Sequence, residues 1–126
     1  MDDNLERGTH SVWDLPVFRK ACETALDAHR LAATLPKHEQ YDLASQLRRS
    51  SKSICANLVE GRGRQQGSNV EFRRFVLIAL GSADESALWC RFARDLGYVS
   101  REDSDRLESQ FSEIARMLNR LAAKLT

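Results

Sequence analysis

Seven basic side chains crowd into one segment of this chain, where they could contact a polyanion. Residues 48–74 contain seven Lys and Arg residues but only two acids, although the formal net charge of the whole chain is +1. Contacts of such side chains with phosphates are largely independent of base sequence and weaken as salt rises. The segment predicts a surface that binds RNA or DNA through Arg48, Arg49, Lys52, Arg62, Arg64, Arg73 and Arg74.

Two other interpretations of these cations stay open. Surface arginines most often form a solvated helix face, and they can also bind the acidic surface of another protein. The alternative function is therefore a protein–protein interaction scaffold without direct nucleic-acid binding. If nucleic acid is the ligand, Arg48→Glu combined with Arg49→Glu should weaken binding without unfolding the protein, and unchanged binding at low salt would contradict this.

Residues that could support catalysis are few and scattered. Asn57, Glu60 and Glu85 could serve acid–base chemistry, but no nucleophile, histidine or metal-ligand set accompanies them at a recognisable spacing. Glu60 is expected to pair with a nearby arginine or to order the turn, and Glu85 to do similar work between helices. The glycine-rich stretch 61–67 lacks the Gly-Lys-Ser/Thr ending and the preceding strand of a nucleotide-binding loop. We expect no enzyme, no cofactor and no metal, and interpret the stretch as a connector or as a mobile finger carrying Arg62 and Arg64.

The remaining chemically versatile residues favour structural roles in a cytoplasmic protein. Cys22, Cys55 and Cys90 are odd in number and widely spaced, as expected of buried, reduced thiols. His29 falls on the inward face of its helix, which favours a hydrogen-bonded core or boundary histidine. Trp13 and Trp89 favour packing or interface roles, and Phe72 and Phe75, both predicted to face inward, offer no exposed platform for stacking bases.

Four helices must position these side chains. Apolar residues recur at helical spacing, and the boundary signals predict helices from about Pro16 to Leu35, His38 to Glu60, Ser68 to Leu96 and Ser100 to the C-terminus. Gly61 is expected to end the second helix with a left-handed cap, and Gly97 to close the third. Short connectors predict an all-α, antiparallel up-down four-helix bundle over residues 13–126, after a flexible lead-in of residues 1–12.

The third helix is apolar on two sides. Phe72, Val76 and Ala79 begin the face expected to point inward, whereas Leu77 and Leu88 lie on the opposite side. Both sides must be buried, so we expect a homo-oligomer, with close approach of another backbone at Gly81. Gly81→Leu or Phe92→Glu should then reduce its mass. The longest apolar run has six residues, too few to span a membrane. The predicted oligomer interface comprises Leu77, Ile78, Gly81, Leu88, Trp89 and Phe92.

With the helices placed, two parts of the chain can be compared with known families: a dense one between Gln46 and Arg64, and a second from Phe72 to Tyr98 that includes Ala79-Leu80-Gly81-Ser82. In these parts the chain resembles the four-helix-bundle family of 23S rRNA-intervening sequence proteins, which includes the accessory variability determinants of diversity-generating retroelements. The resemblance covers about residues 13–125. Phe18, Asp42 and Cys55 depart from the family's usual Trp, Gly and Pro, which affects packing and turns rather than the basic positions.

The resemblance implies an assembly as well as a fold. Members form rings, commonly pentamers, with a basic surface able to meet nucleic acid. In the retroelement branch the resemblance implies a reverse transcriptase as partner, whereas in the ribosomal branch the reading frame lies within an rRNA gene insertion. The sequence does not separate these two branches. It predicts a non-enzymatic oligomeric accessory protein that binds nucleic acid or a complex of nucleic acid and protein.

Overall fold

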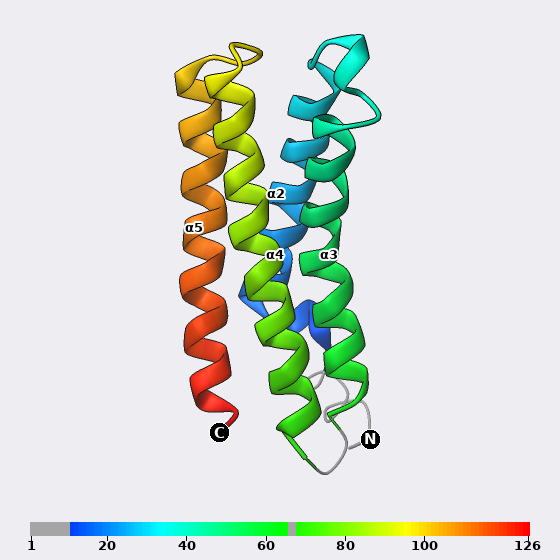
Figure 1. The fold of residues 1–126 in the computed structure, drawn as a ribbon. Helices are drawn as coiled ribbons and strands as arrows, with labels where there is room; N and C mark the ends of the chain where they lie inside the picture. The colour runs from blue at the N-terminus through cyan, green and yellow to red at the C-terminus, as the bar shows by residue number, and fades with distance from the viewer. Residues whose placement is uncertain (1–10, 66–67) are drawn as a thin grey trace.

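Four long helices, packed with antiparallel neighbours, make up most of the computed structural model (Figure 1), which describes residues 11–65 and 68–126. The predicted lead-in therefore lies outside the described residues except for its last two positions. The elements in chain order are the 3₁₀ turn η1 (Val12–Asp14), α2 (Pro16–Ala33), the 3₁₀ turn η2 (Lys37–Glu39), α3 (Leu43–Gly63), α4 (Val70–Asp95) and α5 (Arg101–Lys124).

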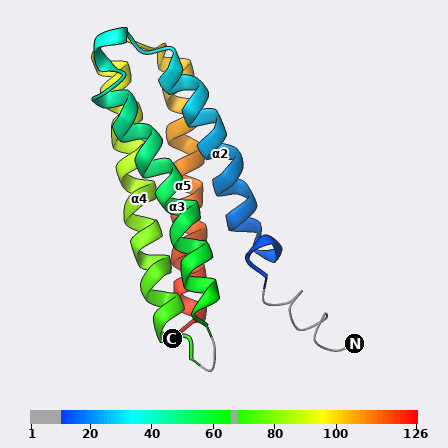
Figure 2. The same cartoon turned by 90° about the vertical axis from the view of Figure 1, so that its right-hand side faces the viewer.

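The bundle core is built from one apolar stripe of each helix. Helix α4 packs closely on both α3 and α5, and α2 closes the bundle against α3 and α5 (Figure 2). Helix α2 contributes mainly small residues such as Ala21, Ala28 and Ala32. The larger core side chains, all fully buried, are Leu47, Ile54, Leu58, Phe72, Val76, Phe111, Ile114 and Leu118.

Two helix ends follow the sequence prediction. The Ser100 hydroxyl accepts a hydrogen bond from the Asp103 backbone N–H at 3.0 Å, which caps the start of α5. Gly97, at the end of α4, has a φ of +81°, a left-handed conformation that glycine adopts without steric cost. Together they make the tight turn between α4 and α5.

Both ends of α3 differ from the prediction. The helix begins at Leu43 rather than near His38, because Pro36 is followed by the separate turn η2. Its other end runs past Gly61 to Gly63, and Gly61 does not have the left-handed conformation expected of a cap. A Cβ at Gly61 would lie only 2.6 Å from the Cβ of Phe75. Gly61 is thus required for the close approach of α3 and α4.

Small polar residues also join α3 to α4, nearer the start of α3 than the close approach at Gly61. The hydroxyls of Ser50 and Ser86 lie 2.8 Å apart, and Ser82 donates to the Ser53 hydroxyl at 2.9 Å. Asn57, considered above for catalysis, donates from its amide to the Ser53 carbonyl at 2.8 Å. These bonds satisfy polar groups at the helix interface, and the two bonds between serines join the helices that carry six of the seven predicted cations.

Candidate nucleic-acid interface and apolar surfaces

The seven predicted cations separate into two groups. Arg48, Arg49 and Lys52 lie in the first half of α3, whereas the other four lie at the opposite end of the bundle, where α3 ends and α4 begins (Figure 1). A helical rise of about 1.5 Å per residue puts Arg48 and Arg64 about 24 Å apart along α3. The structure therefore does not gather the seven into one site.

Two of the seven hold the bundle together. Arg48 donates to the side-chain oxygen of Gln40 at 3.1 Å and to its carbonyl at 2.8 Å. Gln40 in turn donates to the carbonyls at the end of α2, those of Ala32 and Leu35. Arg73 donates to the carbonyl of Ala122, near the end of α5, at 3.3 Å. Arg48 therefore stabilises the connection between α2 and α3, and Arg73 stabilises the packing of α4 on α5.

Three arginines surround two phenylalanines at the far end. The guanidinium carbons of Arg74 and Arg64 lie 4.6 and 5.7 Å from the centre of the Phe75 ring, and that of Arg62 lies 5.4 Å from the Phe72 ring. We call Arg62, Arg64 and Arg74 the arginine cluster. The prediction that both rings face inward holds for Phe72, which is buried, whereas Phe75 is half-buried beneath two guanidinium groups.

Nearby acids neutralise part of this cluster. Arg64 pairs with Glu60, as expected, at 2.8 Å, and Arg74 pairs with Glu71 at 3.0 Å. The hydrogen bond from Arg74, followed by its charge, holds the pKa of Glu71 below its usual value. Burial lowers the pKa of Arg62, against the opposing effect of Asp14. Glycines 61 and 63 belong to α3, and residues 66 and 67 of the predicted finger lie outside the described residues.

Arg49 and Lys52 differ from the other cations. Both are exposed on α3, and neither has a hydrogen bond or an ion pair within residues 11–65 and 68–126. A phosphate or a carboxylate of another molecule could bind either cation without displacing a partner inside this part of the chain.

The residues considered for catalysis have structural partners. Glu85 accepts a hydrogen bond from the indole of Trp89 at 3.1 Å, a contact within α4 rather than the expected one between helices, and Glu60 pairs with Arg64. Among the described residues, no three His, Cys, Asp or Glu side chains are grouped so that they could hold a metal ion. Nor does any helix in this part of the chain have the length and apolar character needed to cross a membrane.

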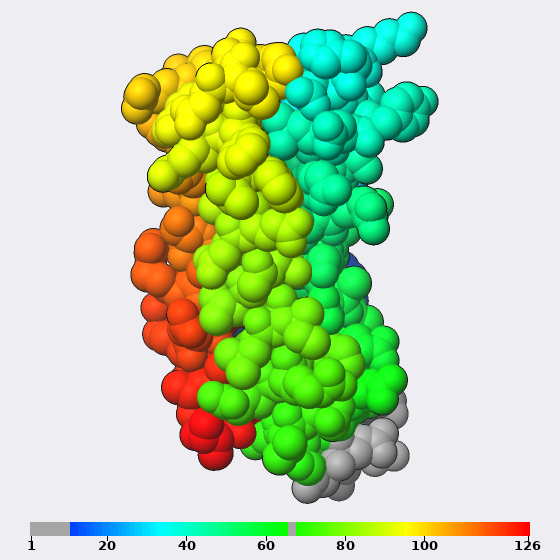
Figure 3. All heavy atoms as spheres, viewed as in Figure 1, coloured from blue at the N-terminus to red at the C-terminus, as the bar shows by residue number. Residues whose placement is uncertain are grey.

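The outward side of α4 exposes large apolar side chains, as the sequence predicted, beside the acids Asp84 and Glu85. Leu77, Leu88 and Phe92 are 38, 45 and 46% exposed. Helix α4 itself runs down the middle of the face shown in Figure 3. Nothing lies within 4 Å of the position that a Cβ would take at Gly81. The Trp89 ring packs edge-on against Phe92 with centroids 5.4 Å apart. We call this surface the α4 stripe: Leu77, Ile78, Gly81, Leu88, Trp89 and Phe92.

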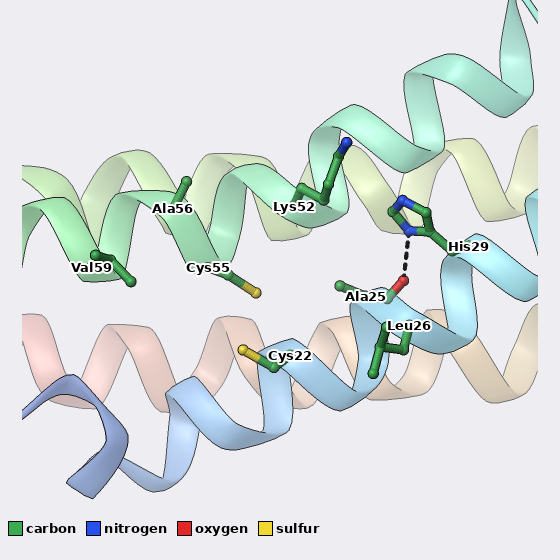
Figure 4. A pocket seen from close by; sticks show the side chains of 8 residues that line it. All are labelled: Cys22, Ala25, Leu26, His29, Lys52, Cys55, Ala56 and Val59. Atoms are coloured by element: carbon green, nitrogen blue, oxygen red, sulfur yellow. Dashed lines mark hydrogen bonds between the residues drawn. The ribbon is translucent and has the colours of Figure 1, made fainter.

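A second apolar surface, which the sequence analysis missed, lies between α2 and α3. We call it the α2–α3 groove, a surface depression of about 530 Å³ (Figure 4). His29 is half-buried at its edge, and its Nδ1 lies 2.9 Å from the Ala25 carbonyl, in line with the expected boundary histidine. The lining residues are Cys22, Ala25, Leu26, His29, Lys52, Cys55, Ala56 and Val59.

The cysteines are divided between this groove and the core. Cys90 is fully buried, as expected, whereas Cys22 and Cys55 are half-buried and point toward one another across the groove (Figure 4). Burial, followed by the nearby Cys22, raises the pKa of Cys55 to about 12. Burial likewise raises the pKa of Cys90 to about 12. Both thiols therefore stay protonated at neutral pH, which favours packing over nucleophilic chemistry.

Comparisons with known proteins agree on one family. The family model described as 23S rRNA-intervening sequence protein matches residues 13–120. The chain is also similar to a crystal structure of a protein with unknown function from the S23 ribosomal protein family of Bacteroides thetaiotaomicron VPI-5482. The two are 27% identical with a TM-score of 0.76, over 84% of this chain and 97% of the other. No curated protein matches the chain.

Proposed function

This chain belongs to the 23S rRNA-intervening sequence protein family, and from that premise we propose that it is a non-enzymatic, homo-oligomeric accessory protein that binds nucleic acid. Its ligand is RNA or DNA, alone or within a complex with protein, and its compartment is the cytoplasm. The observation that carries the proposal is the set of exposed cations Arg49, Lys52, Arg64 and Arg74, the last two with their guanidinium carbons 5.7 and 4.6 Å from the Phe75 ring centre.

The chemistry of this surface suits a flexible polyanion. Arg49 and Lys52 offer charges that no described residue neutralises, and the arginine cluster offers guanidinium groups beside a half-buried aromatic ring. Cations combined with aromatic rings are how many proteins hold single-stranded nucleic acid without reading its sequence. Arg48 and Arg73 contribute indirectly, by stabilising the bundle that carries this surface, because their side chains donate hydrogen bonds to the carbonyls of Gln40 and Ala122.

The homo-oligomer is the second part of the proposal. The α4 stripe leaves several large apolar side chains partly open to water, and burying them against another copy would gain about 25 cal/mol for each Å² of apolar surface. A ring would also multiply the cationic surface by its number of subunits, and the resemblance implies five. A reverse transcriptase is the protein partner implied by the resemblance to the accessory variability determinants, and it is the first partner to test.

A protein-interaction scaffold is the second candidate function. The ion pairs Arg64–Glu60 and Arg74–Glu71 support this candidate, because in both a carboxylate binds a guanidinium group of the arginine cluster. The acidic surface of another protein could supply such groups. A scaffold of this kind would bind its protein partner at salt concentrations that remove generic nucleic acid.

Nucleic-acid binding is tested by a matched pair of triple variants. The test variant combines Arg49→Gln, Arg64→Gln and Arg74→Gln, and the control combines Arg101→Gln, Arg116→Gln and Arg120→Gln; all six side chains are exposed. Fluorescence anisotropy with single-stranded RNA and with duplex DNA is measured across a range of salt. Each lost phosphate contact reduces the slope of log K against log salt by about 0.7 to 0.9.

We expect the test variant to bind at least about tenfold more weakly at low salt, with a slope lower by about 2 to 3. The control should bind like the original protein, and circular dichroism should confirm that both variants are folded. Equal binding by the two variants would contradict the assignment of this surface. If the original protein shows no salt-dependent binding of either nucleic acid, nucleic-acid binding is excluded and the protein-interaction scaffold is favoured.

A further inference from the structure

We propose that the α4 stripe of one copy docks into the α2–α3 groove of a second copy. The inference rests on the homo-oligomer of the proposed function and names the two surfaces that form its contact. Each protomer then presents one stripe and one groove, and uses both when it has a neighbour on each side.

The two surfaces lie on different sides of the bundle. Helix α4 occupies the middle of the face seen in Figure 3, whereas α2 and α3 lie together in the view of Figure 2, turned by 90°. Because the stripe and the groove lie on different sides of each copy, their contact is heterologous rather than two-fold symmetric. It closes as a ring when the rotation between neighbours fits, or continues as a filament when it does not.

The shapes of the two surfaces suit helix-in-groove packing. Small side chains, including Ala25 and Ala56, line the α2–α3 groove, and Leu26 and Val59, 57 and 50% exposed, line it as well. On α4, the open space at Gly81 lets another helix approach, with the larger Leu88 projecting from the same face. Side chains of one helix that enter the groove between two others are the ordinary geometry of helix packing.

Charge decides which occupant the groove accepts. Lys52 is the charged residue of the groove lining. On α4, Asp84 follows Gly81 by three residues and precedes Leu88 by four, so the three residues share one face of the helix. Lys52 and Asp84 are both exposed, and neither has a hydrogen bond or an ion pair in the part of the chain that the structure describes. Docking the stripe into the groove brings the two opposite charges to one interface.

The alternative contact, stripe against stripe, is disfavoured by the same charges. Asp84 and Glu85 are both exposed on the outward side of α4. Two stripes packed around Gly81 would bring the carboxylates of two copies together, where like charges repel. Pairing with Asp84 also moves Lys52 out of the predicted nucleic-acid surface and into the contact between copies. Of Arg48, Arg49 and Lys52, Arg49 then stays without a partner among the residues that the structure describes.

A complementation experiment separates the two arrangements. The stripe variant combines Leu88→Glu with Phe92→Glu, and the groove variant combines Ala56→Glu with Val59→Glu, all at exposed positions. Each variant alone should give the 14.3 kDa mass of one chain by light scattering. An equimolar mixture should form pairs of twice that mass, because the stripe variant keeps its groove and the groove variant keeps its stripe.

A groove variant that assembles like the original protein, or a mixture that stays monomeric, would overturn the inference. Circular dichroism confirms that each variant is folded. An independent charge exchange checks the polar contact: Lys52→Glu and Asp84→Lys should each weaken assembly several-fold, and the two together in one chain should restore it. Failure of the double variant to improve on the single ones would contradict the pairing.

These mass measurements contain no nucleic acid, so their outcome is independent of whether the protein binds nucleic acid. A monomeric original protein would remove the proposed homo-oligomer and this contact together. An oligomer that the groove substitutions leave intact would remove the contact alone. Loss of nucleic-acid binding in the anisotropy experiment would leave the contact between copies untouched.

Discussion

Arg48 and Arg49 are adjacent in the sequence, but their guanidinium groups have different surroundings. Arg48 turns toward the connection between α2 and α3, where it donates to the side chain and the carbonyl of Gln40. Arg49 is exposed and has no such partner within the described residues. Substituting both at once, as the sequence analysis suggested, would therefore mix a loss of stability with a loss of surface charge.

Separate substitutions distinguish these two roles. Arg48→Ala should lower the free energy of unfolding by about 1 to 3 kcal/mol, because it removes hydrogen bonds from a charged donor and leaves a half-buried oxygen of Gln40 without its partner. Arg49→Ala, the matched control one residue away, should change stability by less than about 0.5 kcal/mol. Urea denaturation measures both values. Equal losses would contradict the anchoring role of Arg48.

At the scale of the elements, Gly61 near the end of α3 and Gly81 in the middle of α4 have opposite surroundings. Gly61 lies where α3 meets α4, and an added Cβ would approach the Phe75 Cβ to 2.6 Å. Gly81 is in the middle of α4, with nothing within 4 Å of that position in the single chain. The first glycine is required by packing inside the bundle, whereas the second leaves room on its surface.

The two glycines should therefore respond oppositely to alanine. Gly61→Ala should destabilise the bundle by about 1 to 3 kcal/mol, because both helix backbones must shift. Gly81→Ala should stabilise it by up to about 1 kcal/mol, the difference in helix propensity. Thermal unfolding should be measured on the Leu88→Glu, Phe92→Glu background, so that assembly does not contribute. Destabilisation by both substitutions would mean that Gly81 also packs inside the bundle.

Features that depend on one helix at a time could be predicted from the sequence. Apolar spacing identified the four helices and the inward position of Phe72, and Ser100 marked the start of α5. Features that depend on two helices could not. Three features depend on the distance between neighbouring helices: the role of Gly61, the half-buried position of Phe75 and the α2–α3 groove. The apolar periodicity of one helix carries no information about that distance.

At the scale of the whole molecule, the cationic and apolar surfaces depend on each other. Of the seven predicted cations, Arg49 and Lys52 have no hydrogen bond or ion pair within the described residues, and Arg48 and Arg64 lie about 24 Å apart along the α3 axis. Docking of copies through the α4 stripe would repeat those groups around an assembly. Nucleic acid spanning several protomers would then bind far more tightly than one protomer alone could hold it.

The mass of the purified protein at micromolar concentration tests this account most directly. Size-exclusion chromatography with light scattering should give several times the 14.3 kDa of one chain. Phe92→Glu combined with Leu88→Glu should reduce that mass to a single chain. A folded original protein of 14.3 kDa, with Leu77, Leu88 and Phe92 in contact with water, would contradict it.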